Sequence, residues 1–334
     1  MIRPPRDHDI VGDDRNRFLI VIGNLHPPNG LIAYLKYVES AEETLWRYRN
    51  VFYKRVLESY GVKTLHKNIP KYQKFIYDYV FGTYVPVINL GIIKNYYYPE
   101  IRFREIISKA SDELELTLLE FTDILMRYIK NINNYIGVTG SLLTKTHNVN
   151  VSDIDVVIYG CKCSKEFLES LSNFNILRPT YEELLKQSTI HGLPIEVLTR
   201  IYPPFKKLLI NDELINVIFV DDSQPPRYGS EIYVNLHPIE LIAEVRPRDC
   251  KSLFYPSIAY IDKVIEITHP KNISSHDEIT YIASYEGLYS YVLYLGGRLR
   301  IRGILQKIIP TGKYRVLVGG IEEPGYVIPS LDIY

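Results

Sequence analysis

The sequence lacks several features that would assign it to a specialised class of protein. Its 39 lysine and arginine residues balance 39 aspartate and glutamate residues, so it carries no formal net charge. A chain without excess positive charge is not expected to coat nucleic acid nonspecifically, although it leaves room for a local basic patch. Three cysteines are too few for a disulfide framework and predict a reducing compartment.

Long apolar runs are also missing. No stretch of about 18 apolar residues occurs, so we expect no membrane-spanning helix and no membrane contact. The N-terminal stretch MIRPPRDHDIVGDDRNR is charged where a secretory signal has an apolar region. We therefore predict a cytoplasmic protein.

The length and composition predict a folded chain of more than one domain. With 334 residues the chain is too long for one ordinary small domain. Hydrophobic residues make up 46% and charged residues 23%, which suits a packed core and is not typical of disorder.

The N-terminal part, residues 1–102, reads as a β-hairpin followed by a segment that is irregular or helical. Residues 17–38 predict two strands around a Pro-Pro-Asn-Gly turn. Residues 41–60 look helical or mixed. Residues 61–102 are rich in Tyr, Pro and Gly and predict irregular structure with a short strand near Val85–Leu90.

The central part, residues 103–225, alternates helix and strand patterns. One helix is expected within 103–132, where apolar residues follow a helical stripe. Strands are expected at Tyr135–Thr139 and Ile154–Tyr159. Further helices are expected after Ser164 as an N-cap and after Thr180, which forms a capping-box pattern with Glu183. From residue 226 to 334 the chain reads as consecutive strands, typical of a barrel or sandwich. The predicted class is α+β.

Two acids one residue apart, Asp153 and Asp155, stand among Ile and Val in the stretch GVTGSLLTKTHNVNVSDIDVVIYG. Side chains alternate along a strand, so both carboxylates point the same way, about 7 Å apart along the backbone. Unpaired, they would repel and resist desolvation. A divalent cation such as Mg²⁺ relieves this, because it takes hard oxygen ligands and usually also holds substrate phosphates.

Gly140 and Ser141 follow an apolar strand pattern, and 11 residues lie between Ser141 and Asp153. A glycine allows close approach of the backbone to a ligand, and a serine hydroxyl with backbone N–H groups suits phosphate oxygens. One end of this stretch thus predicts a phosphate site and the other a metal site.

This pattern resembles that of the DNA polymerase β-type nucleotidyltransferase superfamily. The resemblance implies that Gly140 and Ser141 contact a nucleoside triphosphate and that Asp153 and Asp155 ligate Mg²⁺ or Mn²⁺. The whole chain also resembles an archaeal family of predicted nucleotidyltransferases. The superfamily resemblance implies a polymerase β-like central domain that moves a nucleoside monophosphate from an NTP to an acceptor hydroxyl.

The superfamily usually has a third carboxylate on a later strand. In LINVIFVDD the middle position is Asn216, and the acid nearest in sequence is Asp221, which becomes our candidate. Glu231 is a second candidate, and Asp221 also fits a plain turn. Without a third acid, the domain would bind nucleotide and metal but transfer poorly. The alternative function is an inactive member of the fold that acts as an RNA- or protein-binding module.

The stretch RLRIR places Arg298, Arg300 and Arg302 on one face of a predicted strand. Three guanidinium groups on one face can contact RNA. An exposed charged face of a barrel strand explains the same pattern, so both interpretations stay open.

Overall fold

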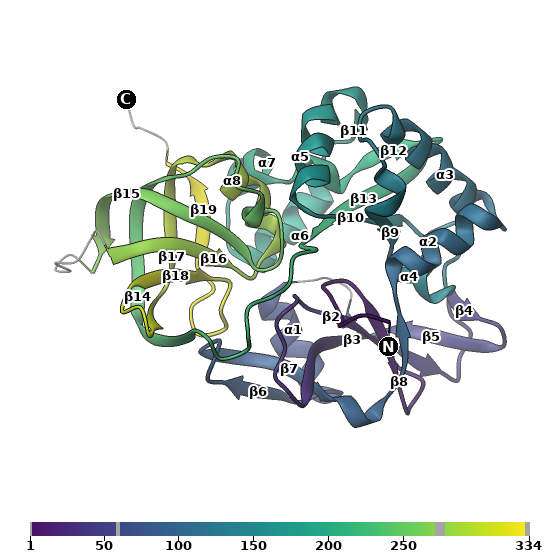
Figure 1. Ribbon diagram of the computed structural model, residues 1–334, viewed down its shortest axis with the longest axis horizontal. Helices are drawn as coiled ribbons and strands as arrows, with labels where there is room; N and C mark the ends of the chain where they lie inside the picture. The colour runs from purple at the N-terminus through teal and green to yellow at the C-terminus, as the bar shows by residue number, and fades with distance from the viewer. Residues whose placement is uncertain (1, 58–60, 271–277, 331–334) are drawn as a thin grey trace. The chain divides into compact units, whose positions relative to one another are not determined.

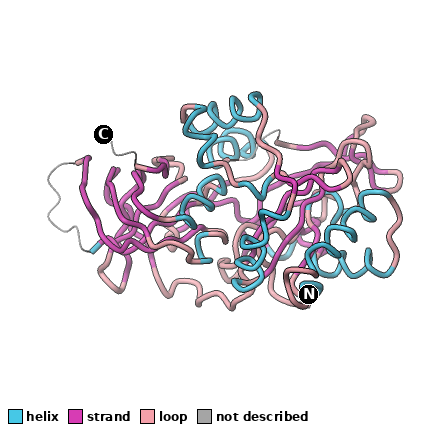
Figure 2. Tube along the Cα trace, turned by 90° about the horizontal axis from the view of Figure 1, so that it is seen from above, coloured by secondary structure: helices cyan, strands magenta, loops and turns pink. Residues whose placement is uncertain are grey.

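A computed structural model describes residues 2–57, 61–270 and 278–330 (Figure 1). The chain forms two compact units, each assembled from three segments. Unit 1 comprises Met1–Glu58, Val87–Arg178 and Pro204–Gln224, and unit 2 comprises the rest. The predicted parts 1–102 and 103–225 therefore each contribute to both units, whereas 226–334 lies within unit 2. Helices and strands are both prominent along the trace (Figure 2), which confirms a mixed helix and sheet protein.

The first sheet of unit 1 is built from N-terminal strands in the order β4-β5-β3-β2-β1-β8. Its strands are β1 (Ile10–Asp13), β2 (Phe18–Val21), β3 (Gly30–Ser40), β4 (Trp46–Tyr48), β5 (Val51–Arg55) and β8 (Ile93–Tyr97). β2 and β3 pair antiparallel, which confirms the predicted hairpin.

Residues 41–57, the described part of the segment interpreted as helical or mixed, form no helix. They contain β4 and β5, which pair antiparallel through Trp46 opposite Tyr53. Bulky aromatic residues suit the pleated surface of a sheet, where they pack on cross-strand neighbours. Here Trp46 and Tyr53 pack with the buried Phe18 and Tyr37.

The second sheet of unit 1 has the order β11-β12-β13-β10-β9. Its strands are β9 (Ile136–Val138), β10 (Ile154–Tyr159), β11 (Asn175–Ile176), β12 (Leu208–Ile210) and β13 (Glu213–Val220). β10 is antiparallel to β9 and parallel to β13. The strand expected at Ile154–Tyr159 is thus confirmed, and it occupies an inner position of this sheet.

The helix expected within residues 103–132 is present but shorter, because the start of this range belongs to a separate helix. The chain forms α2 (Pro99–Ser108) and α3 (Glu113–Met126) instead. The Asp112 side chain accepts a hydrogen bond from the backbone N–H of Glu115 and so begins a new helix. The predicted apolar stripe nevertheless lies in α3, where Leu118 and Phe121 are fully buried.

Two other expected helix starts have different outcomes. α5 (Cys161–Ser170) begins before Ser164, whose hydroxyl instead donates to the carbonyl of Gly160. The start of α6 (Tyr181–His191) is confirmed, because Thr180 and Glu183 form both hydrogen bonds of a capping box.

Unit 2 contains a closed barrel within residues 225–270 and 278–330. Its strands are β14 (Ile232–Val245), β15 (Ser257–His269), β16 (Ile279–Ser284), β17 (Gly297–Ile309) and β18 (Tyr314–Val318). The pairing runs β14-β15-β16-β18-β17, and β14 also pairs with β17, which closes the ring. The remaining elements are α1 (Val62–Asn68), β6 (Phe75–Asp78), β7 (Thr83–Asn89), α6, α7 (Ile195–Ile201), α8 (Ser290–Leu295) and β19 (Tyr326–Pro329).

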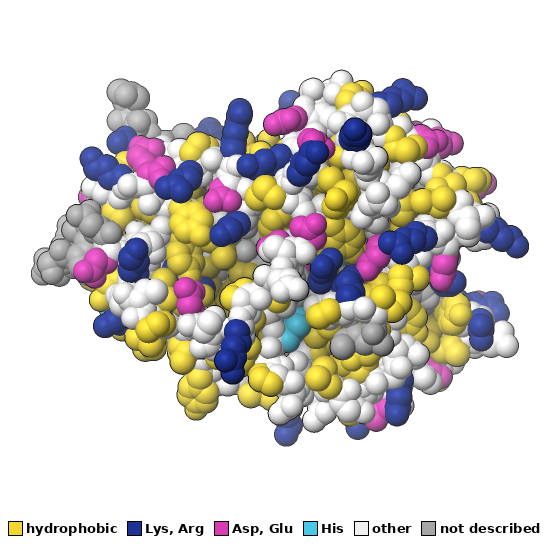
Figure 3. All heavy atoms as spheres, in the orientation of Figure 1, with side chains coloured by type: hydrophobic (Ala, Val, Ile, Leu, Met, Phe, Trp, Pro, Cys, Tyr) yellow, Lys and Arg dark blue, Asp and Glu magenta, His cyan; other side chains and the backbone are white. Residues whose placement is uncertain are grey.

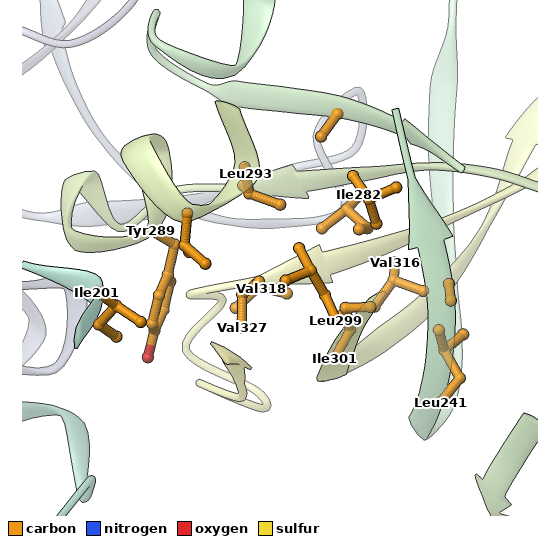
Figure 4. Packing of buried hydrophobic residues seen from close by; sticks show 14 of the residues in the cluster. Ile201, Leu241, Ile282, Tyr289, Leu293, Leu299, Ile301, Val316, Val318 and Val327 are labelled. Atoms are coloured by element: carbon orange, nitrogen blue, oxygen red, sulfur yellow. The ribbon is translucent and has the colours of Figure 1, made fainter. Parts of the chain in front are cut away.

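The barrel interior of unit 2 is apolar. Leu241, Ile282, Leu299 and Val316 from four different strands point toward one another, and Leu293 of α8 lies above them (Figure 4). Burial of such side chains contributes roughly 1.5–3 kcal/mol each. This interior accounts for the alternating apolar pattern of the C-terminal strands.

The surface carries charges of both signs. On the face shown in Figure 3, Lys and Arg side chains are interspersed with Asp and Glu side chains. Among the described residues, no helix is long and apolar enough to cross a membrane.

Candidate active site

The Gly140-Ser141 pair lies where β9 ends and the short helix α4 (Gly140–Thr144) begins. Gly140 has a φ of +66°, a conformation that side-chain-bearing residues rarely adopt. A Cβ atom at this position would lie 2.4 Å from Asp155 Oδ2. The glycine therefore permits the backbone to pass directly beside the Asp155 carboxylate. Ser141 is 5% exposed.

Asp155 is the second residue of β10, and Asp153 immediately precedes the strand. Asp153 is exposed and Asp155 is half-buried. The negative charge of Asp155 raises the pKa of Asp153 to about 6, and partial desolvation adds to this effect. The positive charges of Arg55 and Lys36 lower the pKa and offset part of this shift. The two predicted aspartates, one residue apart in the chain, thus repel each other electrostatically.

Asn216 lies directly beside Asp155 on the parallel strand β13. Its Nδ2 atom donates a hydrogen bond of 2.7 Å to Asp155 Oδ1. Its Oδ1 atom is buried and has no hydrogen-bond partner. The position that faces the Asp155 carboxylate from the neighbouring strand is thus occupied by an amide and not by an acid.

Lys206 adds a positive charge near the same carboxylate. Desolvation lowers the pKa of Lys206, whereas the charges of Asp155 and Asp7 act in the opposite direction. The site therefore combines two acids with cations from distant parts of the chain. Sequence reasoning missed Lys36, Arg55 and Lys206, because no local spacing links them to Asp153 or Asp155.

A cleft of about 370 Å³ opens beside Asp153. Trp46 and Arg55 of the N-terminal sheet line one part of it, and Asp212 and Glu213 line another. The Arg55 guanidinium lies over the Trp46 ring, 4.9 Å from its centroid. An aromatic ring, a guanidinium and three carboxylates thus border one space, in which the ring can contact a base and the guanidinium a phosphate.

Asp221 is not brought to the two aspartates. β13 runs parallel to β10, with Asn216 beside Asp155 and Val220 beside Tyr159. Val220 is therefore about 13 Å further along the strand than Asn216, and Asp221 follows it. Asp221 Oδ1 instead accepts a hydrogen bond from the backbone N–H of Ser223, as in a turn. Our other candidate, Glu231, belongs to unit 2 and accepts from the Tyr233 hydroxyl.

The three arginines of β17 lie on one face, as the alternation predicts, but each has an acidic partner. Arg298 lies 3.4 Å from Glu244, and Arg300 lies 3.4 Å from Glu240. Arg302 lies 3.1 Å from Glu323. These ion pairs favour the interpretation of a charged barrel face over that of an RNA contact.

Among the described residues, Asp112, Glu115 and His147 form a second group of metal-ligand type, with ligand atoms within 4.8 Å of one another. Glu115 is fully buried and bonds the Arg102 guanidinium and Ser111. His147 Nε2 lies 2.9 Å from Asp112 Oδ2. Because the carboxylates of Asp112 and Glu115 already have partners within the protein, the group has the character of a structural ion-pair network.

The elements β9, α4 and β10 follow one another in the chain and place a glycine beside a strand carboxylate. Residues 121–220 match the nucleotidyltransferase domain family. The match includes Gly140, Ser141, Asp153, Asp155 and Asn216. It supports the nucleotidyltransferase superfamily for this part of the chain and a nucleotidyl-transfer function. Comparison with curated proteins and with solved structures gave no match.

Proposed function

We propose that unit 1 transfers a nucleoside monophosphate from a nucleoside triphosphate to an acceptor hydroxyl with the help of a divalent cation. The observation that carries this proposal is the closeness of Asp153 and Asp155, whose mutual repulsion raises the pKa of Asp153 to about 6. Two carboxylates that repel each other in this way form a site that a bound divalent cation would stabilise. The nucleotidyltransferase match supports the reaction class.

The donor atoms fit Mg²⁺ or Mn²⁺. Asp153 and Asp155 offer carboxylate oxygens, and the buried, unpartnered Asn216 Oδ1 is a further oxygen at the same place. Hard divalent cations prefer oxygen ligands of this kind. Asp153 and Asp155 would hold the ion. When bound, it would supply Lewis-acid polarisation of the phosphoryl oxygens.

The chain's own residues have separate tasks in this proposal. Gly140 lets the backbone that would hold the triphosphate pass directly beside the Asp155 carboxylate, and Ser141 follows it in the chain. Arg55 and Lys206 contribute positive charge toward the anionic substrate. The acceptor oxygen forms a bond to the α-phosphorus while the bond from this phosphorus to the bridging oxygen breaks, and pyrophosphate leaves.

β13 offers no carboxylate beside Asp155 that could accept the proton of the acceptor hydroxyl. The Asn216 amide is not basic, so it cannot act as the general base that a third acid provides. In our proposal the proton passes to solvent and the reaction is correspondingly slow.

Asn216 also favours a second candidate function. If the missing third acid abolishes transfer, unit 1 is an inactive nucleotidyltransferase fold and the protein acts as an RNA- or protein-binding module. Asp221 does not rescue the site, because the register of β10 and β13 places it beyond the far end of β10.

A labelled-nucleotide assay separates the two functions. The intact protein is incubated with each α-labelled NTP, Mg²⁺ or Mn²⁺, and total RNA. Asp153→Asn removes one charge of the pair, and Glu169→Gln removes a charge from an exposed position of α5 that does not line the cleft. Transfer that is lost in Asp153→Asn and kept in Glu169→Gln supports the enzyme. Transfer that survives Asp153→Asn contradicts our site, and no transfer with any NTP favours the binding module.

A further inference from the structure

The order in which the strands of the unit 2 barrel are connected identifies the type of barrel. Within residues 225–270 and 278–330, the ring runs β14-β15-β16-β18-β17 and back to β14, and β16 and β18 are its parallel pair. α8 lies between β16 and β17 in the chain. This is the connectivity of an OB barrel, in which the outer face of the second and third strands commonly holds oligonucleotides or oligosaccharides. Those strands are β15 and β16 here. Because one fold hosts many functions, the side chains on this face must decide the ligand.

The strand register shows which side chains of β15 and β16 point out of the barrel. Ala259 of β15 pairs with Ile282 of β16, and both belong to the apolar interior. The next pair, Tyr260 and Tyr281, therefore points to the outer face. Both tyrosines are half-buried, and their ring centroids are 6.0 Å apart at an angle of 62°. Two neighbouring rings are thus held in place on the outer surface of β15 and β16.

Two cationic side chains lie near the Tyr260 ring. The Arg246 guanidinium lies 5.7 Å and the Lys251 ammonium 5.5 Å from its centroid. Lys251 Nζ is also 3.3 Å from the Tyr260 hydroxyl. Both cationic side chains are exposed, and Arg246 also pairs with the exposed Asp262 at 2.8 Å. An exposed pair of this kind contributes little and exchanges readily with a phosphate.

The local charge balance favours an anionic ligand. The stretch from residue 246 to 263 contains four cationic side chains and two acidic ones. The cationic residues are Arg246, Arg248, Lys251 and Lys263, and all four are exposed. The arginine face of β17 is balanced instead, because its three arginines lie beside three glutamates.

We propose that the outer face of β15 and β16, with Tyr260, Tyr281, Arg246 and Lys251, binds single-stranded nucleic acid. Bases stack on the tyrosine rings, and the cations contact the phosphates. Base stacking on an aromatic ring tolerates any sequence, whereas phosphate contacts make binding depend on salt. An uncharged oligosaccharide would use the rings but not the cations. Binding at this face requires neither a nucleoside triphosphate nor a divalent cation, so it stands apart from catalysis.

Fluorescence anisotropy with labelled single-stranded RNA and DNA of about 16 nucleotides tests the proposal on the full chain, with a chelator and without NTP. We expect binding that weakens with salt. The double variant Tyr260→Ala/Tyr281→Ala should weaken it by roughly tenfold or more, and Tyr260→Phe/Tyr281→Phe should retain most of it. Lys251→Ala should reduce the slope of log K against log salt by about 1.

The matched control is Arg298→Ala/Arg302→Ala, which removes two cations from the ion-paired face of the same barrel. Binding should be unchanged in this variant, and circular dichroism should show a folded barrel in all variants. Three results would overturn the proposal: equal binding in the Tyr→Ala variant, loss of binding in the Arg298/Arg302 variant, or binding of neutral oligosaccharides but not of nucleic acid. Because no NTP is present, failure here is distinct from failure of the transfer reaction.

Discussion

Asn216 Nδ2 donates a 2.7 Å hydrogen bond to Asp155 Oδ1 from the neighbouring parallel strand. This amide stands where a third carboxylate would face the metal. Asn216→Asp should therefore accelerate metal-dependent transfer by roughly tenfold or more, since a general base contributes that much or more. Single-turnover transfer with Mg²⁺ measures the effect.

The same variant gives a second readout. A third negative charge beside Asp153 and Asp155 should lower the melting temperature without metal, because like charges repel. Mg²⁺ should then raise the melting temperature more in Asn216→Asp than in the wild type. Unchanged transfer together with an unchanged response to Mg²⁺ would argue against a metal site at Asp153 and Asp155.

Gly140→Ala tests the close approach of backbone and carboxylate. The left-handed conformation costs an alanine about 1–2 kcal/mol, and the new Cβ would also lie 2.4 Å from Asp155 Oδ2. Gly192→Ala is the matched control, since Gly192 has a φ of +68° and a Cβ added there would meet nothing within 4 Å. Denaturant unfolding should show a larger loss for Gly140→Ala, and only this variant should lose NTP transfer. Equal losses in both would mean that the space beside Asp155 is unimportant.

The buried pair of Arg102 and Glu115 should be essential to unit 1. Glu115 is fully buried, and its carboxylate bonds the Arg102 guanidinium. Arg102→Met should cost about 3–5 kcal/mol of unfolding free energy, because it leaves a buried charge without its partner. The double variant Arg102→Met/Glu115→Leu should recover most of the loss. Lys162→Met removes an exposed pair with Glu166 and should cost less than about 1 kcal/mol. A small loss in Arg102→Met would contradict the importance of this pair.

His26 should make the stability of unit 1 depend on pH. Burial lowers the pKa of His26 to about 4 from an ordinary value of 6.5. Its Nδ1 atom accepts a hydrogen bond from the backbone N–H of Ile32, which requires an unprotonated nitrogen. The unfolded chain therefore binds a proton that the folded chain does not, and stability falls as the pH drops from 6.5 toward 4. The full effect is about 3 kcal/mol.

Denaturant unfolding at about pH 7 and about pH 5 checks this expectation. His26→Gln should flatten the dependence on pH in this window, whereas His269→Gln, at an exposed position, should leave it unchanged. The same slope in His26→Gln and the wild type would show that other groups cause the dependence.

Local patterns in the sequence predicted local structure well. The capping box of Thr180 and Glu183 forms because both hydrogen bonds join residues three apart. The strand Ile154–Tyr159 forms where a short apolar run predicted it. Residues 41–60 were interpreted as helical or mixed, and the helical interpretation was wrong within 41–57, because packing of Trp46 and Tyr53 against neighbouring strands outweighs local helix propensity.

The sequence by itself determined the Gly140-Ser141 pair, the two aspartates that follow it, and the strand that carries Asp155. These features depend on spacing within one short stretch of the chain. Only the tertiary structure decided what surrounds them. Asn216 is 61 residues from Asp155 along the chain and meets it because β10 and β13 pair in parallel register. That register depends on the packing of both strands in one core, which no local spacing encodes, and it also separates Asp221 from the site.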